Sequence, residues 1–198
     1  RIHSAVLTAL GPVCIAAATG VNLYLFHYIE LFFIGLLFHT YLFVLNEVKD
    51  VEIDKKSKDL STKPLVDGTI NIKKARFVVI LSVLLVLVLT LIFFYDQLYI
   101  LIIVSLAAFL FGALYDTYGK KIPHADYLIA ISAFFVALYG GFSVTNSLGL
   151  FAYIIVLLGL VQILINNIIA GLKDVDHDFV TGGLSTPLRM KVKVYGQN

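Results

Sequence analysis

Cysteine, tryptophan and charged residues are scarce in this 198-residue chain. The single cysteine, Cys14, excludes an internal disulfide framework and a cysteine-ligated zinc site. Charged residues make up 14% of the chain, whereas soluble domains carry about 25%. Hydrophobic residues make up 60%, which leaves too few polar side chains to cover the outside of a soluble enzyme. The composition therefore indicates an integral membrane protein.

Six uninterrupted apolar stretches follow one another along the chain. They are 4–26, 31–45, 77–95, 98–115, 127–144 and 148–172. A helix of about 18 residues covers about 27 Å, close to the roughly 30 Å hydrocarbon core of a bilayer. The second stretch is short, so we expect its helix to continue through Asn46 into the charged segment that follows. The sequence thus predicts an all-α fold, a polytopic membrane helical bundle with six spans in this chain.

All fifteen lysines and arginines fall on one side of the membrane if successive spans alternate in direction. Eleven of the thirteen acidic residues share that side. By the positive-inside rule, the N-terminus and the loops on this side are cytoplasmic. The formal net charge is only +2, which is too mild to suggest nucleic acid as a partner. The expected partner is the lipid bilayer, and no obligate protein partner is inferred.

Two polar segments repeat each other at an offset of 124 residues. The segment 49–54, Lys-Asp-Val-Glu-Ile-Asp, aligns with 173–178, Lys-Asp-Val-Asp-His-Asp. Seven of the fourteen positions in 49–62 are identical in the second copy. We interpret the segments 46–70 and 173–189 as two aspartate-rich copies of one unit, so the chain is predicted to be pseudo-duplicated.

Each copy carries two aspartates four residues apart, Asp50 with Asp54 and Asp174 with Asp178. On a helix such a pair lies on one face, where the like charges repel. A divalent cation would compensate them, because Mg²⁺ prefers carboxylates and completes its shell with water and phosphate oxygens. Two facing pairs would hold a diphosphate through two or more Mg²⁺ ions. The alternative is that these are boundary carboxylates balanced by neighbouring lysines in solvated pairs.

Amide and basic side chains accompany the aspartates. Asn46 lies one turn before Asp50, and Asn167 lies seven residues before Asp174. We expect Asn167 to line the cavity and Gln162 to pack in the bundle interior. Basic groups can neutralise phosphate oxygens, although ordinary retention of topology also explains them. The candidate diphosphate-binding residues are Asn46, Lys63, Tyr115, Lys120, Lys121, Asn167 and Arg189.

The segment from Asn46 to Asp54 resembles the first aspartate-rich motif of the UbiA superfamily of intramembrane prenyltransferases, N-D-x-x-D-x-x-x-D. Glu47 stands in place of the first aspartate. The segment 63–70, Lys-Pro-Leu-Val-Asp-Gly-Thr-Ile, looks like the family's R-P-L-x-x-G-x-I, with lysine for arginine. The segment 174–178 is similar to the second motif. The tyrosine and lysines of 115–121 resemble those between the family's fourth and fifth helices, so the resemblance covers nearly the whole chain.

The resemblance implies nine helices around a central cavity, of which this chain supplies six. We therefore expect residues 1–198 to form a single transmembrane prenyltransferase domain that lacks its C-terminal three helices. The implied activity is Mg²⁺-dependent transfer of an isoprenyl group from an allylic isoprenyl diphosphate to an aromatic or lipid acceptor, through an allylic carbocation. The implied catalytic and metal-binding residues are Asp50, Asp54, Asp174 and Asp178.

Two other classes of membrane protein use intramembrane carboxylates. A CDP-alcohol phosphotransferase would place D-G and A-R in one run with later aspartates, and the sequence has no such run. A cation or proton transporter would carry its carboxylates near the bilayer midplane. Here they cluster at one boundary beside lysine-rich loops, which favours an enzyme reached from the cytoplasmic side.

Overall fold

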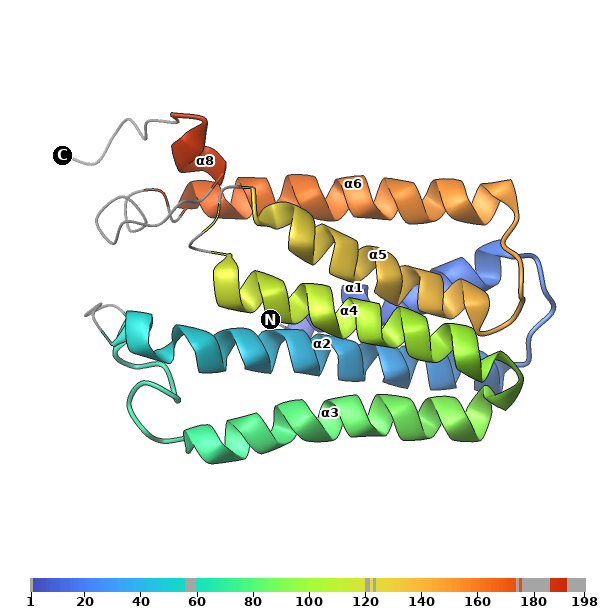
Figure 1. Ribbon diagram of the computed structural model, residues 1–198, viewed down its shortest axis with the longest axis horizontal. Helices are drawn as coiled ribbons and strands as arrows, with labels where there is room; N and C mark the ends of the chain where they lie inside the picture. The colour runs from blue at the N-terminus through green and yellow to red at the C-terminus, as the bar shows by residue number, and fades with distance from the viewer. Residues whose placement is uncertain are drawn as a thin grey trace.

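Six long helices, laid lengthwise beside one another, make up most of the computed structural model (Figure 1). The structure describes residues 2–55, 60–119, 122, 124–173, 175 and 186–191, and of residues 2, 3, 173, 188 and 189 only the backbone. The long helices are α1 (Ile2–Ala18), α2 (Leu25–Asp54), α3 (Ile72–Phe93), α4 (Leu98–Tyr118), α5 (Asp126–Phe142) and α6 (Leu150–Lys173). Two short helices join them, η2 (Tyr95–Gln97) and α8 (Thr186–Arg189).

Length and apolar composition qualify four of these helical segments to cross a membrane. They are α2, α3, α6 and the segment Tyr95–Tyr118, which joins η2 to α4. The apolar helices α1 and α5 are shorter, with 17 residues each. The expected all-α membrane bundle is confirmed, and the described residues contain no strand.

Most helix ends lie within a few residues of the ends of an apolar stretch, and the larger differences are at both ends of α2, at the start of α3 and at the end of α1. α2 continues through Asn46 as far as Asp54, as the short second stretch predicts. α1 ends at Ala18, although the apolar stretch continues to residue 26. Gly20 adopts a positive φ of 74°, and its N–H donates to the carbonyl of Ala17 at 3.2 Å. A left-handed glycine just past the last turn ends a helix whatever the hydropathy of the residues that follow.

The helices pack through small residues and a few buried hydrogen bonds. α1 contacts α2 and α5, α4 contacts α2 and α5, and α3 and α6 lie at opposite edges (Figure 1). A Cβ atom added at Gly35 would lie 2.7 Å from the Cα atom of Ala9, so α1 and α2 approach closely only because this residue is glycine. The hydroxyl groups of Thr90 on α3 and Tyr139 on α5 share a hydrogen bond of 2.8 Å in the buried core. Such interhelical bonds satisfy polar groups that the bilayer core cannot.

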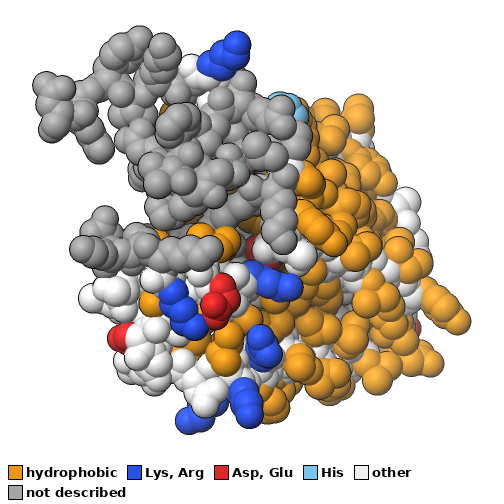
Figure 2. Space-filling view, turned by 60° about the vertical axis from the view of Figure 1, so that its left-hand side comes forward, with side chains coloured by type: hydrophobic (Ala, Val, Ile, Leu, Met, Phe, Trp, Pro, Cys, Tyr) orange, Lys and Arg blue, Asp and Glu red, His pale blue; other side chains and the backbone are white. Residues whose placement is uncertain are grey.

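The connections between helices sort by charge onto the two ends of the bundle. The described parts of the α2–α3 and α4–α5 connections, together with α8, lie at one end, which we call the charged end (Figure 1). The α1–α2, α3–α4 and α5–α6 connections lie at the other end and contain no lysine or arginine. Figure 2 shows charged side chains gathered near the charged end and a broad hydrophobic surface along the helices. The bundle therefore collects those predicted site residues that the structure describes at one end.

Candidate functional site

The last turns of α2 carry the first set of predicted site residues. α2 is continuous to Asp54, so Asn46, Asp50 and Asp54 follow at four-residue intervals along one face of the helix. The side chain of Asp54 is 4% exposed, whereas those of Asn46 and Asp50 are half-buried. The first half of the predicted carboxylate arrangement is therefore present at the charged end.

Lys63 forms the main ion-pair cluster of this region. Its Nζ atom lies 2.7 Å from Oδ2 of Asp54 and 3.4 Å from Oε2 of Glu47. Partial burial acts to lower the pKa of Lys63, but the hydrogen bond to Asp54 and the charges of Glu47 and Asp54 outweigh burial and raise the pKa. Lys63 thus neutralises Asp54, which the sequence predicts to bind a metal, and Glu47, which stands in place of the first aspartate of the motif.

A compact turn after α2 holds Lys63 in this position. The backbone N–H of Val66 donates to the carbonyl of Lys63 at 2.8 Å, and the N–H of Ile70 donates to the carbonyl of Pro64 at 2.8 Å. Gly68 has a φ of 85°, a conformation that glycine adopts without strain. The Lys-Pro-Leu-Val-Asp-Gly-Thr-Ile segment therefore returns over the end of α2 and directs its lysine at the carboxylates.

Asp116 joins the site from α4 and was not among the residues predicted from the sequence. The Nδ2 atom of Asn46 donates to Oδ1 of Asp116 at 3.1 Å, and the negative charge of Asp50 also acts on Asp116. The other oxygen, Oδ2, is buried and has no hydrogen-bond partner in the described part of the chain. One feature of the sequence could have indicated Asp116: it is an acidic residue directly after Tyr115, in the last turn of an otherwise apolar helix.

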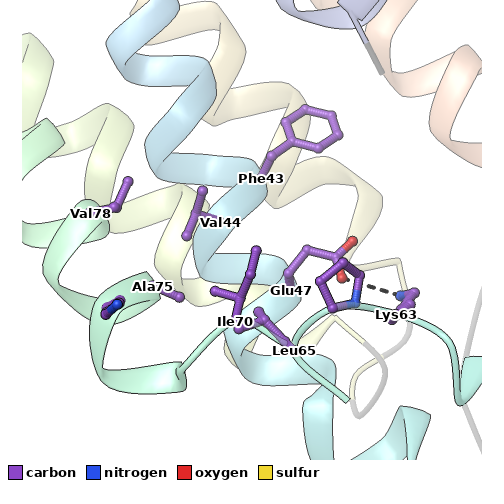
Figure 3. Close-up of a pocket in the computed structure, with 10 residues that line it drawn as sticks. Phe43, Val44, Glu47, Lys63, Leu65, Ile70, Ala75 and Val78 are labelled. Carbon is purple, nitrogen blue, oxygen red and sulfur yellow. Dashed lines mark ion pairs between the residues drawn. The ribbon is translucent and has the colours of Figure 1, made fainter. Parts of the chain in front are cut away.

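A pocket of about 530 Å³ opens between α2, α3 and the turn that follows α2 (Figure 3). The Glu47–Lys63 ion pair lies at one end of it, and mostly apolar side chains line the rest. The lining residues are Phe43, Val44, Glu47, Lys63, Pro64, Leu65, Ile70, Lys74, Ala75 and Val78. The pocket therefore combines a charged end beside the aspartates with an apolar interior.

The exposure of Gln162 on α6 differs from the interior position that the sequence predicts, whereas Asn167 is partly covered. Gln162 is exposed, and its Nε2 atom donates to Oδ1 of Asn166 at 3.0 Å on the same helix. The expected interior position of Gln162 is therefore wrong, because it pairs with its own i+4 neighbour on the outer face of α6. Asn167 is half-buried, and its Nδ2 atom is buried without a hydrogen-bond partner among the residues described.

Most of the remaining predicted site residues, in the second copy and in the α4–α5 connection, lie outside the described residues. This applies to Asp174 and Asp178 and to Lys120 and Lys121, and for Arg189 only the backbone, in α8, is described. Tyr115 is placed in the last turn of α4, at the charged end. The predicted facing of the two aspartate pairs stays a prediction.

The donor atoms of the described half-site suit a hard divalent cation such as Mg²⁺. Glu47, Asp50 and Asp54 offer carboxylate oxygens, and Asn46 offers an amide oxygen. The Oδ2 atom of Asp116 is buried without a hydrogen-bond partner among the described residues, although the charges of both Asp50 and Lys49 act on this carboxyl group, and a further cation nearby would stabilise it. Within the described ranges no three acidic, histidine or cysteine side chains converge into a metal-ligand group. These residues fit part of a metal site, with further ligands required.

Comparison with known proteins identifies a family. The sequence model of the UbiA prenyltransferase family matches residues 4–195. No curated protein matches the chain. A UbiA homologue from Aeropyrum pernix K1, solved without ligand, superposes with a TM-score of 0.79 at 16% identity, over 95% of this chain and 70% of that one.

Two further solved structures share the fold. A digeranylgeranylglyceryl phosphate synthase gives a TM-score of 0.74 at 24% identity, over 96% of this chain and 66% of that one. A UbiA homologue from Archaeoglobus fulgidus bound to DMAPP and Mg²⁺ gives 0.74 at 19% identity, over 94% and 66%. The chain therefore spans about two-thirds of the length of these structures.

Proposed function

The chain belongs to the UbiA prenyltransferase family, and from that premise we propose that it transfers an isoprenyl group from an allylic isoprenyl diphosphate to an aromatic or lipid acceptor within the membrane. The observation that carries the proposal is the set of carboxylates at the end of α2, which adjoins a pocket with an apolar interior. An amphiphile with a diphosphate head and an isoprenyl tail matches both parts of this arrangement. The similar structure from Archaeoglobus fulgidus binds DMAPP and Mg²⁺, which supports the same ligand class here.

The diphosphate end of the donor is assigned to the two aspartate pairs. Asp50 and Asp54 would hold one or more Mg²⁺ ions from α2, and Asp174 and Asp178 would do so from the second copy. Magnesium, when bound, neutralises the diphosphate and makes it a better leaving group. The allylic C–O bond then breaks with its electron pair going to the diphosphate. The acceptor supplies the pair for the new bond and loses a proton.

Lys63 has two successive roles in this proposal. Without a cation, its ammonium group neutralises Asp54 and Glu47. With a cation bound at Asp54, the ammonium group would be available to bind a phosphate oxygen of the donor. Tyr115 and Asn167 complete the proposed diphosphate surface, together with Lys120, Lys121 and Arg189.

The apolar part of the pocket would receive the beginning of the isoprenyl tail. Val44 of α2 and Val78 of α3 line it between the two helices, and Phe43 of α2 lines it as well (Figure 3). Such a lining excludes water, and water would otherwise capture an allylic cation. The aromatic face of Phe43 also favours positive charge close by.

Metal-dependent binding of the donor tests the proposal. Binding of geranylgeranyl diphosphate to the full chain is measured with Mg²⁺ and with a chelator, in the wild type and in the Asp50→Asn and Asp174→Asn variants. Asp96→Asn is the matched control, because Asp96 is exposed at the opposite end of α4. We expect binding to require Mg²⁺ and to be lost in both site variants but not in the control. Binding that is indifferent to metal or to either site substitution would overturn the proposal.

The charged end is proposed to face the cytoplasm, together with the N-terminus. The described basic residues of the α2–α3 connection, Lys55 and Lys63, lie at this end, which is the observation that supports the assignment. A membrane-impermeant thiol reagent tests it on a Cys14→Ser background, with a single cysteine placed either at Thr69 or at Thr145. Thr69 should react only from the cytoplasmic side and Thr145 only from the other, and the reverse pattern would refute the orientation.

A further inference from the structure

Asp116 is a half-buried carboxylate, with its Oδ2 atom fully buried, that the proposed chemistry does not use. It lies in the last turn of α4, 70 positions along the chain from the asparagine that it contacts. We propose that Asp116 is a positioning residue of the diphosphate site, which fixes the side-chain amide of Asn46 so that its carbonyl oxygen is left for a cation. This inference rests on the proposed function and adds a residue to its site.

The direction of the Asn46–Asp116 hydrogen bond follows from the chemistry of the two groups. An asparagine amide can present either its NH₂ group or its carbonyl oxygen to a neighbour. The Nδ2 atom of Asn46 donates to Oδ1 of Asp116 at 3.1 Å, as an amide NH₂ group does to an acceptor oxygen of a carboxyl group. The carbonyl oxygen Oδ1 of Asn46 is thereby directed away from Asp116, and it is an oxygen ligand of the type that Mg²⁺ accepts.

Helix packing alone does not account for a carboxylate at this position. Its Oδ2 atom is buried without a hydrogen-bond partner in the described chain, and both the like charge of Asp50 and the opposite charge of Lys49 act on the carboxyl group. Such a group is costly to bury. A neutral hydrogen bond already joins the same two helices, because Oη of Tyr41 donates to the carbonyl of Phe109 at 2.9 Å. The charge of Asp116 is therefore better explained by the site than by the docking of α4 on α2.

Residues that orient a metal ligand have measurable effects on metal affinity. Loss of such a partner typically weakens metal binding by about 10–100-fold. We expect Asp116→Ala to weaken binding of Mn²⁺, used as the probe for Mg²⁺, by a factor in this range in the presence of inorganic diphosphate. Binding is read from the electron paramagnetic resonance signal of free Mn²⁺, so the measurement does not depend on turnover.

A double-mutant cycle tests whether Asp116 acts through Asn46. If it does, Asn46→Ala weakens Mn²⁺ binding and adding Asp116→Ala to that variant weakens it no further. If the two losses multiply instead, Asp116 acts independently and the inference is overturned. Asp96→Asn serves as the charge control. Tyr41→Phe serves as the structural control, because it removes the α2–α4 hydrogen bond and should lower thermal stability without changing Mn²⁺ affinity.

Failure of the inference and failure of the proposed function give different results. If the wild-type chain binds no Mn²⁺ with diphosphate, the proposed function fails. If the wild type binds Mn²⁺ and Asp116→Ala binds it equally well, only the positioning role fails. A Tyr41→Phe variant that loses Mn²⁺ affinity as much as Asp116→Ala would also overturn it, because helix docking would then explain both.

Discussion

Replacement of Lys63 by methionine removes the ammonium group that the structure pairs with Asp54 and Glu47. Methionine keeps most of the length of the side chain and deletes its charge. The lysine side chain is 26% exposed, that of Glu47 is 20% exposed and that of Asp54 is 4% exposed. An exposed ion pair contributes about 0.2–1 kcal/mol. Removal of one partner of a fully buried pair costs about 3–5 kcal/mol, because the other charge is left uncompensated.

The partial burial of this cluster places the expected loss between those limits, at about 2 kcal/mol. For a chain of this size, 1 kcal/mol corresponds to about 2–4 °C in Tm, so the expected decrease is about 4–8 °C. The assay is thermal loss of helical circular dichroism in detergent with a chelator present. Lys55→Met is the matched control, since Lys55 pairs with Glu52 at 2.9 Å with both side chains exposed, and its Tm should change by less than about 2 °C.

Magnesium should restore much of the stability that Lys63→Met loses, because a cation held by Asp54 takes over the role of the ammonium group. The raised pKa of Lys63 also sets the pH dependence. Because the pKa of Lys63 is raised in the folded state, the contribution of its ion pairs to the free energy of unfolding is fully present below the usual pKa of 10.5. This contribution is lost only as pH rises through the higher folded-state pKa. The Tm difference from the wild type should therefore be constant between about pH 7 and 9. Equal Tm values for the Lys63→Met and Lys55→Met variants, with equal responses to Mg²⁺, would refute the reasoning.

Three further predictions concern packing and the metal. Gly35→Ala should destabilise the chain by about 1–3 kcal/mol, because the new methyl group meets the backbone of Ala9, whereas Gly11→Ala, with open space around it, should be neutral or stabilising in the same melting assay. Thr90→Val should lower stability by about 0.6–1.7 kcal/mol through loss of its hydrogen bond to Tyr139. A double-mutant cycle with Tyr139→Phe should show that the stability losses of the two variants are not additive. Removal of Mg²⁺ by a chelator should abolish binding of geranylgeranyl diphosphate while leaving helical circular dichroism intact, and a loss of helix on chelation would instead indicate a structural metal.

Much of the fold follows from local features of the sequence. The apolar stretches place all six long helices, and the four-residue spacing of Asp50 and Asp54 places them on one face of α2. One exception is α1, which ends eight residues before its apolar stretch does. Hydropathy measures the solvent that a residue prefers, whereas the positive φ of Gly20 decides where the helix hydrogen bonds stop.

Contacts between side chains follow less directly from the sequence than the helices do. Gln162 was expected inside the bundle because polar residues in apolar spans usually face inward, yet it bonds Asn166 on the exposed face of α6. Asp116 was overlooked because its relation to Asn46 joins two helices and has no periodic signal along either one.

Hydropathy and helical periodicity are local properties, so the residues alone establish a helical membrane protein and predict most of its charges at one end, with aspartates paired one turn apart. The contacts of Lys63 with Asp54 and Glu47, and of Asp116 with Asn46, exist only once the chain has folded. Those contacts depend on how a turn folds back and on which faces α2 and α4 present to each other, and neither is encoded in the residues of one helix alone.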